Sequence, residues 1–105
     1  MSNNQTTLNL IKSVALHFLP NCEVILFGSR AKKDFRKDSD YDIMIISEKT
    51  LSINKKMHYK SKIRKALVKQ NIVADILLNS KEEVDKKQNL LGHIVREVMK
   101  EGIFL

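Results

Sequence analysis

The chain has 105 residues, of which 43% are apolar, with a formal net charge of +7 and a single cysteine, Cys22. This length predicts one compact domain over residues 1–105 with enough apolar residues for a core. One cysteine excludes an intramolecular disulfide and a multi-cysteine zinc site. A polar N-terminus and the lack of any apolar run near the ~20 residues that span a bilayer predict a cytoplasmic protein without a membrane segment. The positive charge favours an anionic partner without identifying it.

Apolar periodicity predicts alternating helices and strands along the first three quarters of the chain. Helical spacing of apolar residues predicts one helix over residues 8–18 and another over residues 52–70, the second capped by Ser52. Between them, one or two helical turns are expected near residues 29–35. Three short apolar runs have the length of strands and cover residues 22–27, 41–46 and 72–78.

The last quarter of the chain predicts one more helix and a short edge strand. Ser80, followed by Glu82 and Glu83, is typical of a helix start, because acidic residues in the first turn suit the helix dipole. An apolar stripe then continues to Gly102, which we expect as the C-cap, and residues 103–105 could add an edge strand. The resulting order of elements predicts the α/β class, with helices covering a sheet.

Asp40 and Asp42 begin the second predicted strand. Because strand side chains alternate, the two carboxylates share a face, and Met44 follows them on it. Two carboxylates about 5 Å apart at an effective dielectric near 20 repel each other by roughly 3 kcal/mol. A divalent cation removes that penalty, and Mg²⁺ fits because it binds through one or two carboxylates plus substrate phosphates.

Two further features point to the same place. Asp75 interrupts an otherwise hydrophobic strand, where an isolated charge is costly unless something pairs with it. If this strand lies beside the second, its carboxylate can reach the same cation, hold a second one or take a proton. Gly28 and Ser29 end the first strand, where the glycine backbone and the serine hydroxyl can approach a phosphate. Arg30 could clamp a phosphate or pair with a nearby acid.

Gly28-Ser29, ten intervening residues and Asp40-Tyr41-Asp42 together resemble the signature of the DNA polymerase β-type nucleotidyltransferase superfamily. Within it, the segment GSRAKKDFRKDSDYDIMI is similar to the MNT-type minimal nucleotidyltransferases, and the similarity continues to the ending REVMKEGIFL. The resemblance implies a small mixed β-sheet flanked by helices, as in the polymerase β palm. It also implies Mg²⁺-dependent transfer of a nucleoside monophosphate from an NTP to an acceptor.

The resemblance assigns roles to the residues that match its motif. Gly28 and Ser29, with Arg30 beside them, would bind the triphosphate of ATP. Asp40 and Asp42 would bind two Mg²⁺ ions, and Asp75 would complete the metal site and help to deprotonate the acceptor. The sequence departs from the family pattern at two positions: Lys33 stands where glycine is frequent and Lys37 where proline is frequent.

The resemblance also implies a partner, because minimal nucleotidyltransferases are commonly paired with a helical HEPN-type protein, often a ribonuclease toxin. In some pairs the transferase is the antitoxin and adds AMP to the toxin, which makes transfer to a partner hydroxyl our first hypothesis. A non-catalytic antitoxin that occludes its partner, or transfer to a small-molecule hydroxyl such as that of an aminoglycoside, remains an alternative. Nucleic-acid binding through the basic segment 55–65 is the weakest hypothesis.

Overall fold

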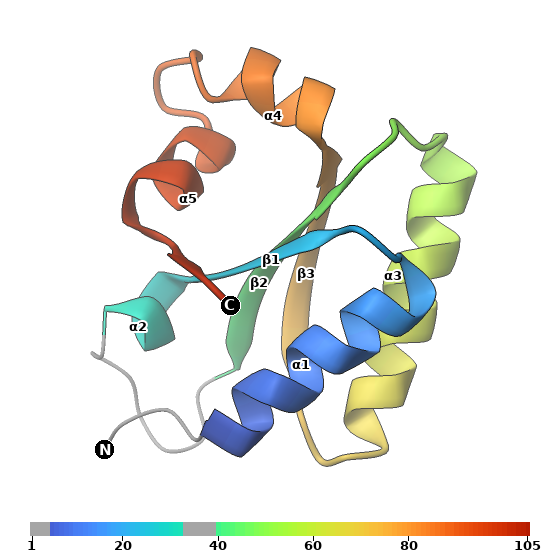
Figure 1. Ribbon diagram of the computed structural model, residues 1–105. Helices are drawn as coiled ribbons and strands as arrows, with labels where there is room; N and C mark the ends of the chain where they lie inside the picture. The colour runs from blue at the N-terminus through green and yellow to red at the C-terminus, as the bar shows by residue number, and fades with distance from the viewer. Residues whose placement is uncertain (1–4, 33–39) are drawn as a thin grey trace.

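The computed structural model describes residues 5–32 and 40–105. Its helices and strands follow one another in the α/β order that the sequence predicts (Figure 1). Within these residues, no helix combines the length and apolarity needed to cross a membrane. The elements are α1 (Gln5–Phe18), β1 (Glu23–Phe27), α2 (Gly28–Ala31), β2 (Tyr41–Ser47), α3 (Ile53–Val68), β3 (Ala74–Ser80), α4 (Lys81–Lys87), α5 (Ile94–Glu101) and β4 (Ile103–Phe104).

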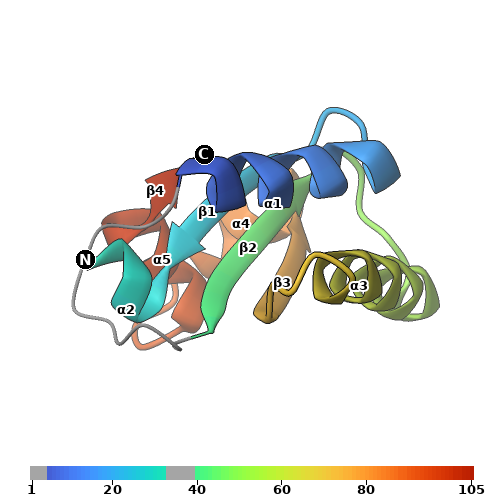
Figure 2. The same cartoon turned by 90° about the horizontal axis from the view of Figure 1, so that it is seen from below.

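The strands form one mixed sheet in the order β3-β2-β1-β4. β1 runs antiparallel to both β2 and β4, whereas β2 and β3 are parallel and are joined through α3. A parallel pair requires such a crossover, because the chain must return to the end at which it started. Helices α1 and α3 cover one face of the sheet and α4 and α5 cover the other (Figures 1 and 2). The predicted fold, a small mixed sheet flanked by helices, is confirmed.

Side-chain alternation along β2 divides the core between these two layers. Ile43 and Ile45 pack in the cluster with α1 and α3, and Met44 and Ile46 pack in the cluster with α4 and α5. The same alternation places Asp42 on the α4–α5 side of the sheet, since it precedes Met44 by two residues.

Two predicted boundaries and one predicted burial differ from the structure. The predicted third strand begins two residues later, because Asn71 adopts a positive φ of 60° in the turn after α3 and Ile72 still bonds back to Leu67. The predicted final helix is two helices, α4 and α5, separated at Gly92, whose φ is +76°. Leu91, which we assigned to the apolar stripe, is 87% exposed.

The C-terminal tail forms the predicted edge strand. Gly102 ends α5, and a Cβ at this position would collide with the side chain of Ile25 and the carbonyl oxygen of Val98. Glycine therefore allows the chain to turn closely onto the sheet, where Phe104 pairs with Ile25.

Candidate functional site

Asp42 and Asp75 are direct neighbours in the parallel register of β2 and β3. Each is the second residue of its strand, so the parallel pairing brings both to the same edge of the sheet and onto the same face. On the other side of Asp42, the register places Phe27, the last residue of β1. The structure therefore brings together two of the three predicted carboxylates, and Asp40 lies just before β2.

Gly28 lies against the carboxylate of Asp42. It leaves β1 with a φ of +71°, and a Cβ built on it would collide with Oδ2 of Asp42 and lie 3.1 Å from Cγ. Both the backbone conformation and the close approach require glycine here. Ser29 follows as the second residue of α2 and is half-buried. The glycine of the Gly-Ser signature and the second aspartate of the Asp-x-Asp signature are thus in contact.

The three carboxylates repel one another. Burial raises the pKa of the Asp42 carboxyl, and the negative charges of Asp75 and Asp40 raise it further. Asp40 and Asp75 are exposed, and none of the ion pairs found in residues 5–32 and 40–105 involves any of the three acids. The charged form of Asp42 is therefore disfavoured by its surroundings, which is the condition that a bound cation relieves.

This set of donors fits a divalent cation that takes its other ligands from water and phosphate. In the described part of the chain, however, no three His, Cys, Asp or Glu side chains are gathered closely enough to hold a metal ion by themselves. The predicted ligand set of Asp40, Asp42 and Asp75 is therefore an open edge of carboxylates and not a closed cage.

Arg30, which we expect to clamp a phosphate or pair with a nearby acid, packs against β2 in the structure. It is buried, and its guanidinium carbon lies 3.9 Å from the centroid of the Tyr41 ring, a cation–π contact. Tyr41 precedes Asp42 in β2, so its side chain alternates away from that carboxylate toward the α1–α3 side. In this arrangement Arg30 fastens α2 to β2, which holds Gly28 and Ser29 beside Asp42. Lys33 and Lys37, the two departures from the family pattern, lie outside the described residues.

A cavity of about 250 Å³, which sequence reasoning missed, adjoins the carboxylate edge. Phe27 and Gly28 line it together with four residues of α5. The sequence signal was present, because residues 94, 97, 98 and 101 recur at the spacing of one helix face. The sequence predicts the apolar members of this set only as part of an amphipathic stripe.

Comparison with known proteins assigns the family. A family model described as "Polymerase beta, Nucleotidyltransferase" matches residues 11–105, and the matched range contains Gly28, Ser29 and all three aspartates. The chain belongs to the polymerase β nucleotidyltransferase family. The predicted superfamily is therefore confirmed, and the nucleotidyltransferase signature coincides with the contact between Gly28 and Asp42.

Two similar proteins extend this assignment. A protein of Methanocaldococcus jannaschii named "Putative protein adenylyltransferase MJ0604" is 32% identical to this nucleotidyltransferase over 80 residues, which is 76% of this chain and 73% of the relative. A crystal structure of a "putative nucleotidyltransferase" from Sulfolobus solfataricus is similar in fold, with a TM-score of 0.51 at 21% identity. That likeness covers 99% of this chain and 89% of the other.

Proposed function

We propose that this nucleotidyltransferase transfers AMP from ATP to a hydroxyl group of a partner protein in a Mg²⁺-dependent reaction. The observation that carries the proposal is the pair Asp42–Asp75, adjacent in register at an exposed edge and in contact with Gly28. The name of the M. jannaschii relative supports ATP as donor and a protein as acceptor. A cytoplasmic location, which the sequence predicts, is compatible with a supply of ATP.

The residues of the site have different roles in this reaction. Asp40 and Asp42 would hold Mg²⁺, with Asp75 as a further ligand. When bound, the metal neutralises charge on the attacking and leaving oxygens of an in-line displacement. Ser29 donates its hydroxyl hydrogen to a phosphate oxygen, and Gly28 leaves the room that a side chain would fill.

Asp75 is the residue in the best position to accept the acceptor's proton. Its side chain is exposed, whereas Asp42 is partly buried between Phe27 and Asp75. The acceptor oxygen forms a bond to the α-phosphorus of ATP, the bond to pyrophosphate breaks, and the hydroxyl proton passes to the carboxylate. Proton transfer to a positioned carboxylate contributes typically 10²–10⁴-fold to the rate.

We propose a HEPN-type helical protein as the partner and acceptor, in a hetero-oligomer with this chain. The family resemblance is the ground for this choice, and the net charge of +7 favours a partner with an acidic surface. The transfer would make this chain the antitoxin of a toxin–antitoxin pair.

The test uses the wild-type protein and the double variant Asp40→Ala/Asp42→Ala, each co-expressed with the partner. Wild type should label the partner from radiolabelled ATP in the presence of Mg²⁺ and protect cells from it. The double variant should still form the complex but neither label nor protect. Protection by an unlabelled complex would reject transfer and favour occlusion, and labelling of an aminoglycoside instead of the partner would favour a small-molecule acceptor.

A further inference from the structure

The cavity beside the carboxylate edge lies between α2 and α5. Its apolar walls are Phe27 from β1 and Ile94 and Val98 from α5. Lys32 and Glu101 also line the cavity and form an ion pair of 3.2 Å, which joins the residue after α2 to the last residue of α5. Figure 1 shows α2 and α5 on either side of the end of β1.

Two of the lining residues connect this cavity directly to the candidate catalytic edge. Phe27 is the register partner of Asp42 on β1, and Gly28 touches the Asp42 carboxylate. A molecule with one end in the cavity therefore has its other end at the carboxylates. A nucleotide that binds its phosphates at Gly28 and Ser29 has such a shape.

The volume and lining of the cavity fit one part of a nucleotide. About 250 Å³ is below the roughly 300–1,000 Å³ of sites that enclose drug-sized ligands. A single flat base is small enough to enter, whereas a whole triphosphate is not. Apolar side chains from two elements, Phe27 of β1 and the Ile94–Val98 pair of α5, line the cavity and suit a base, as aromatic and apolar side chains stack on bases in other sites.

The polar groups of the lining disfavour phosphate and favour a hydrogen-bond donor. Glu97 lines the cavity, and among the described residues it takes part in none of the ion pairs, whereas Glu101 is paired with Lys32. An ionised carboxylate only accepts hydrogen bonds. Adenine, cytosine and guanine carry exocyclic amino groups that donate. Where cytosine has its amino group, uracil has a carbonyl oxygen that would face the carboxylate, and its donor on this edge is the single ring N3–H.

We propose that this cavity binds the base of the nucleoside triphosphate and that Glu97 selects bases with an exocyclic amino group over uracil. The inference rests on the proposed function and assigns the nucleotide preference of the same site. CTP and UTP are the best matched probes, because their rings are equal in size and differ at the amino group and the adjacent ring nitrogen.

The experiment measures the Kd of non-hydrolysable α,β-methylene analogues of ATP, CTP and UTP with Mg²⁺ by calorimetry. Wild type should bind the ATP and CTP analogues at least about tenfold more tightly than the UTP analogue, as expected for a hydrogen bond to a charged group. Glu97→Gln should reduce that preference to threefold or less, because a carboxamide both donates and accepts. Glu82→Gln on α4, outside the cavity, should retain the full preference.

A second pair of variants tests whether the base occupies this space. Ile94→Trp fills the cavity and should weaken binding of all three analogues at least tenfold, whereas Leu91→Trp, at a position 87% exposed and outside the lining, should not. Equal Kd values for the CTP and UTP analogues, or normal binding by Ile94→Trp, would overturn the inference. No binding of any analogue to wild type would overturn it as well.

These outcomes differ from a failure of the proposed function. Transfer of AMP by wild type with an unchanged base preference in Glu97→Gln would reject the base pocket alone. Selective binding of the analogues without transfer to any acceptor would reject the proposed function and leave the base pocket in place. If Ile94→Trp blocked transfer without changing any Kd, the cavity would be an acceptor site.

Discussion

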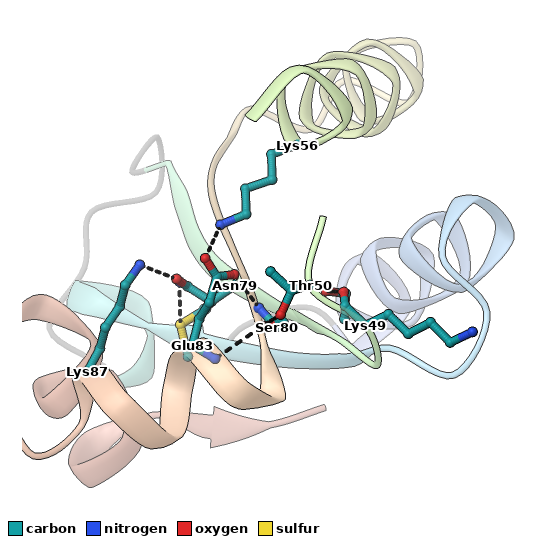
Figure 3. A network of polar contacts seen from close by, with 9 residues as sticks. Lys49, Thr50, Lys56, Asn79, Ser80, Glu83 and Lys87 are labelled. Carbon is teal, nitrogen blue, oxygen red and sulfur yellow. Dashed lines mark hydrogen bonds and ion pairs between the residues drawn. The ribbon is translucent and has the colours of Figure 1, made fainter. Parts of the chain in front are cut away.

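The parallel strands β2 and β3 carry polar side chains at both ends, but the surroundings of those side chains differ. At the end where both strands begin, Asp42 and Asp75 lie side by side, and no ion pair within residues 5–32 and 40–105 includes them. At the end where both strands finish, Ser80 and Asn79 are buried and hydrogen-bonded (Figure 3).

The second end is a closed network. Ser80 and Glu83 form a capping box at the start of α4, and the hydroxyls of Ser80 and Thr50 are 2.7 Å apart. Lys56 of α3 reaches across to Glu83, with 2.6 Å between Nζ and Oε2. Figure 3 shows these side chains converging from α3, β3 and α4. The network stabilises the junction between the crossover helix and the helix after β3.

The pKa values of Asp42 and Glu83 shift in opposite directions at the two ends of the β2–β3 pair. Burial acts to raise the pKa of both Asp42 and Glu83. Neighbouring acids raise the pKa of Asp42 further. Glu83 instead accepts hydrogen bonds from Lys56 and the Ser80 amide and lies beside the Lys56 charge. These interactions outweigh burial and hold the pKa of Glu83 below its ordinary value. Glu83 is thus paired, whereas no ion pair among residues 5–32 and 40–105 includes Asp42, at the end of the sheet where the signature residues meet.

The largest expected effect comes from removing the proposed proton acceptor. Asp75→Asn should lower the rate of AMP transfer by about 10²-fold or more, because the amide cannot take the acceptor's proton. Its folded state should be unaffected, since Asp75 is exposed and the substitution removes a repulsive charge beside Asp42. Asp85→Asn, an exposed aspartate of α4, is the matched control and should transfer at the wild-type rate. Equal rates for the two variants would exclude Asp75 from the chemistry.

Two glycines with similar backbone angles allow the contact with Asp42 to be isolated. Gly28 and Gly92 have φ values of +71° and +76°, but only at Gly28 would a Cβ meet another group. Gly92→Ala should therefore cost about 1 kcal/mol of backbone strain in the free energy of unfolding. Gly28→Ala should cost roughly 1–3 kcal/mol more, because the methyl group displaces the Asp42 carboxylate.

Chemical denaturation of both alanine variants measures this difference. Only Gly28→Ala should also lose transfer activity, since only there does the methyl group reach the site. Equal destabilisation by the two substitutions would show that the contact between Gly28 and Asp42 carries no energy.

Breaking the closed network should affect stability and leave the chemistry intact. Lys56→Met removes the partner of a Glu83 side chain that is 22% exposed, and we expect a loss of about 1–3 kcal/mol in the free energy of unfolding. Lys55→Met, on the exposed side of the same turn, should cost less than about 0.5 kcal/mol. Per folded molecule, both variants should transfer AMP at the wild-type rate, and a selective loss of transfer in Lys56→Met would contradict this division of roles.

The smallest expected effect is a pair of opposite pH dependences. The lowered pKa of Glu83 means that its stabilisation is present above the ordinary value of 4.5 and is lost as pH falls through the folded pKa. The raised pKa of Asp42 means the reverse: the native state holds the proton more tightly, so this group destabilises the fold as pH rises above 3.8.

Urea unfolding of wild type, Glu83→Gln and Asp42→Asn between pH 3 and 7 measures both dependences. The difference in the free energy of unfolding between wild type and Glu83→Gln should shrink as pH falls below about 4.5. The greater stability of Asp42→Asn relative to wild type should also shrink on acidification, because Asp42 becomes protonated. Mg²⁺ should reduce the advantage of Asp42→Asn at pH 7. Parallel pH curves for all three proteins would contradict the assigned pKa directions.

The sequence was sufficient for features that depend on local rules or on strand register. Asp42 and Asp75 each break an apolar strand near its start, so parallel pairing alone brings them together. The expected helix start at Ser80 is confirmed, and the capping box that Ser80 forms there with Glu83 also depends on hydrogen bonds within one helical turn.

Tertiary context decided the remaining features. The apolar residues around Leu91 have the spacing of one continuous helix, yet the chain turns at Gly92. From the sequence, Arg30 could clamp a phosphate or pair with a nearby acid, and only the packing of α2 on β2 places it over Tyr41. The cavity beside Gly28 requires α5 to return to β1, which no local pattern predicts.

The most direct test of the account compares two carboxylates that differ in their partners. Asp42→Asn and Glu83→Gln each neutralise one carboxyl group. Two quantities are measured for each variant: the rate of Mg²⁺-dependent AMP transfer to the co-purified partner, and the free energy of unfolding. We predict that Asp42→Asn loses at least about 100-fold in rate without losing stability, whereas Glu83→Gln loses stability and retains its rate per folded molecule. Wild-type transfer by Asp42→Asn would contradict the central claim that the carboxylates at the start of β2 and β3 are the catalytic ones.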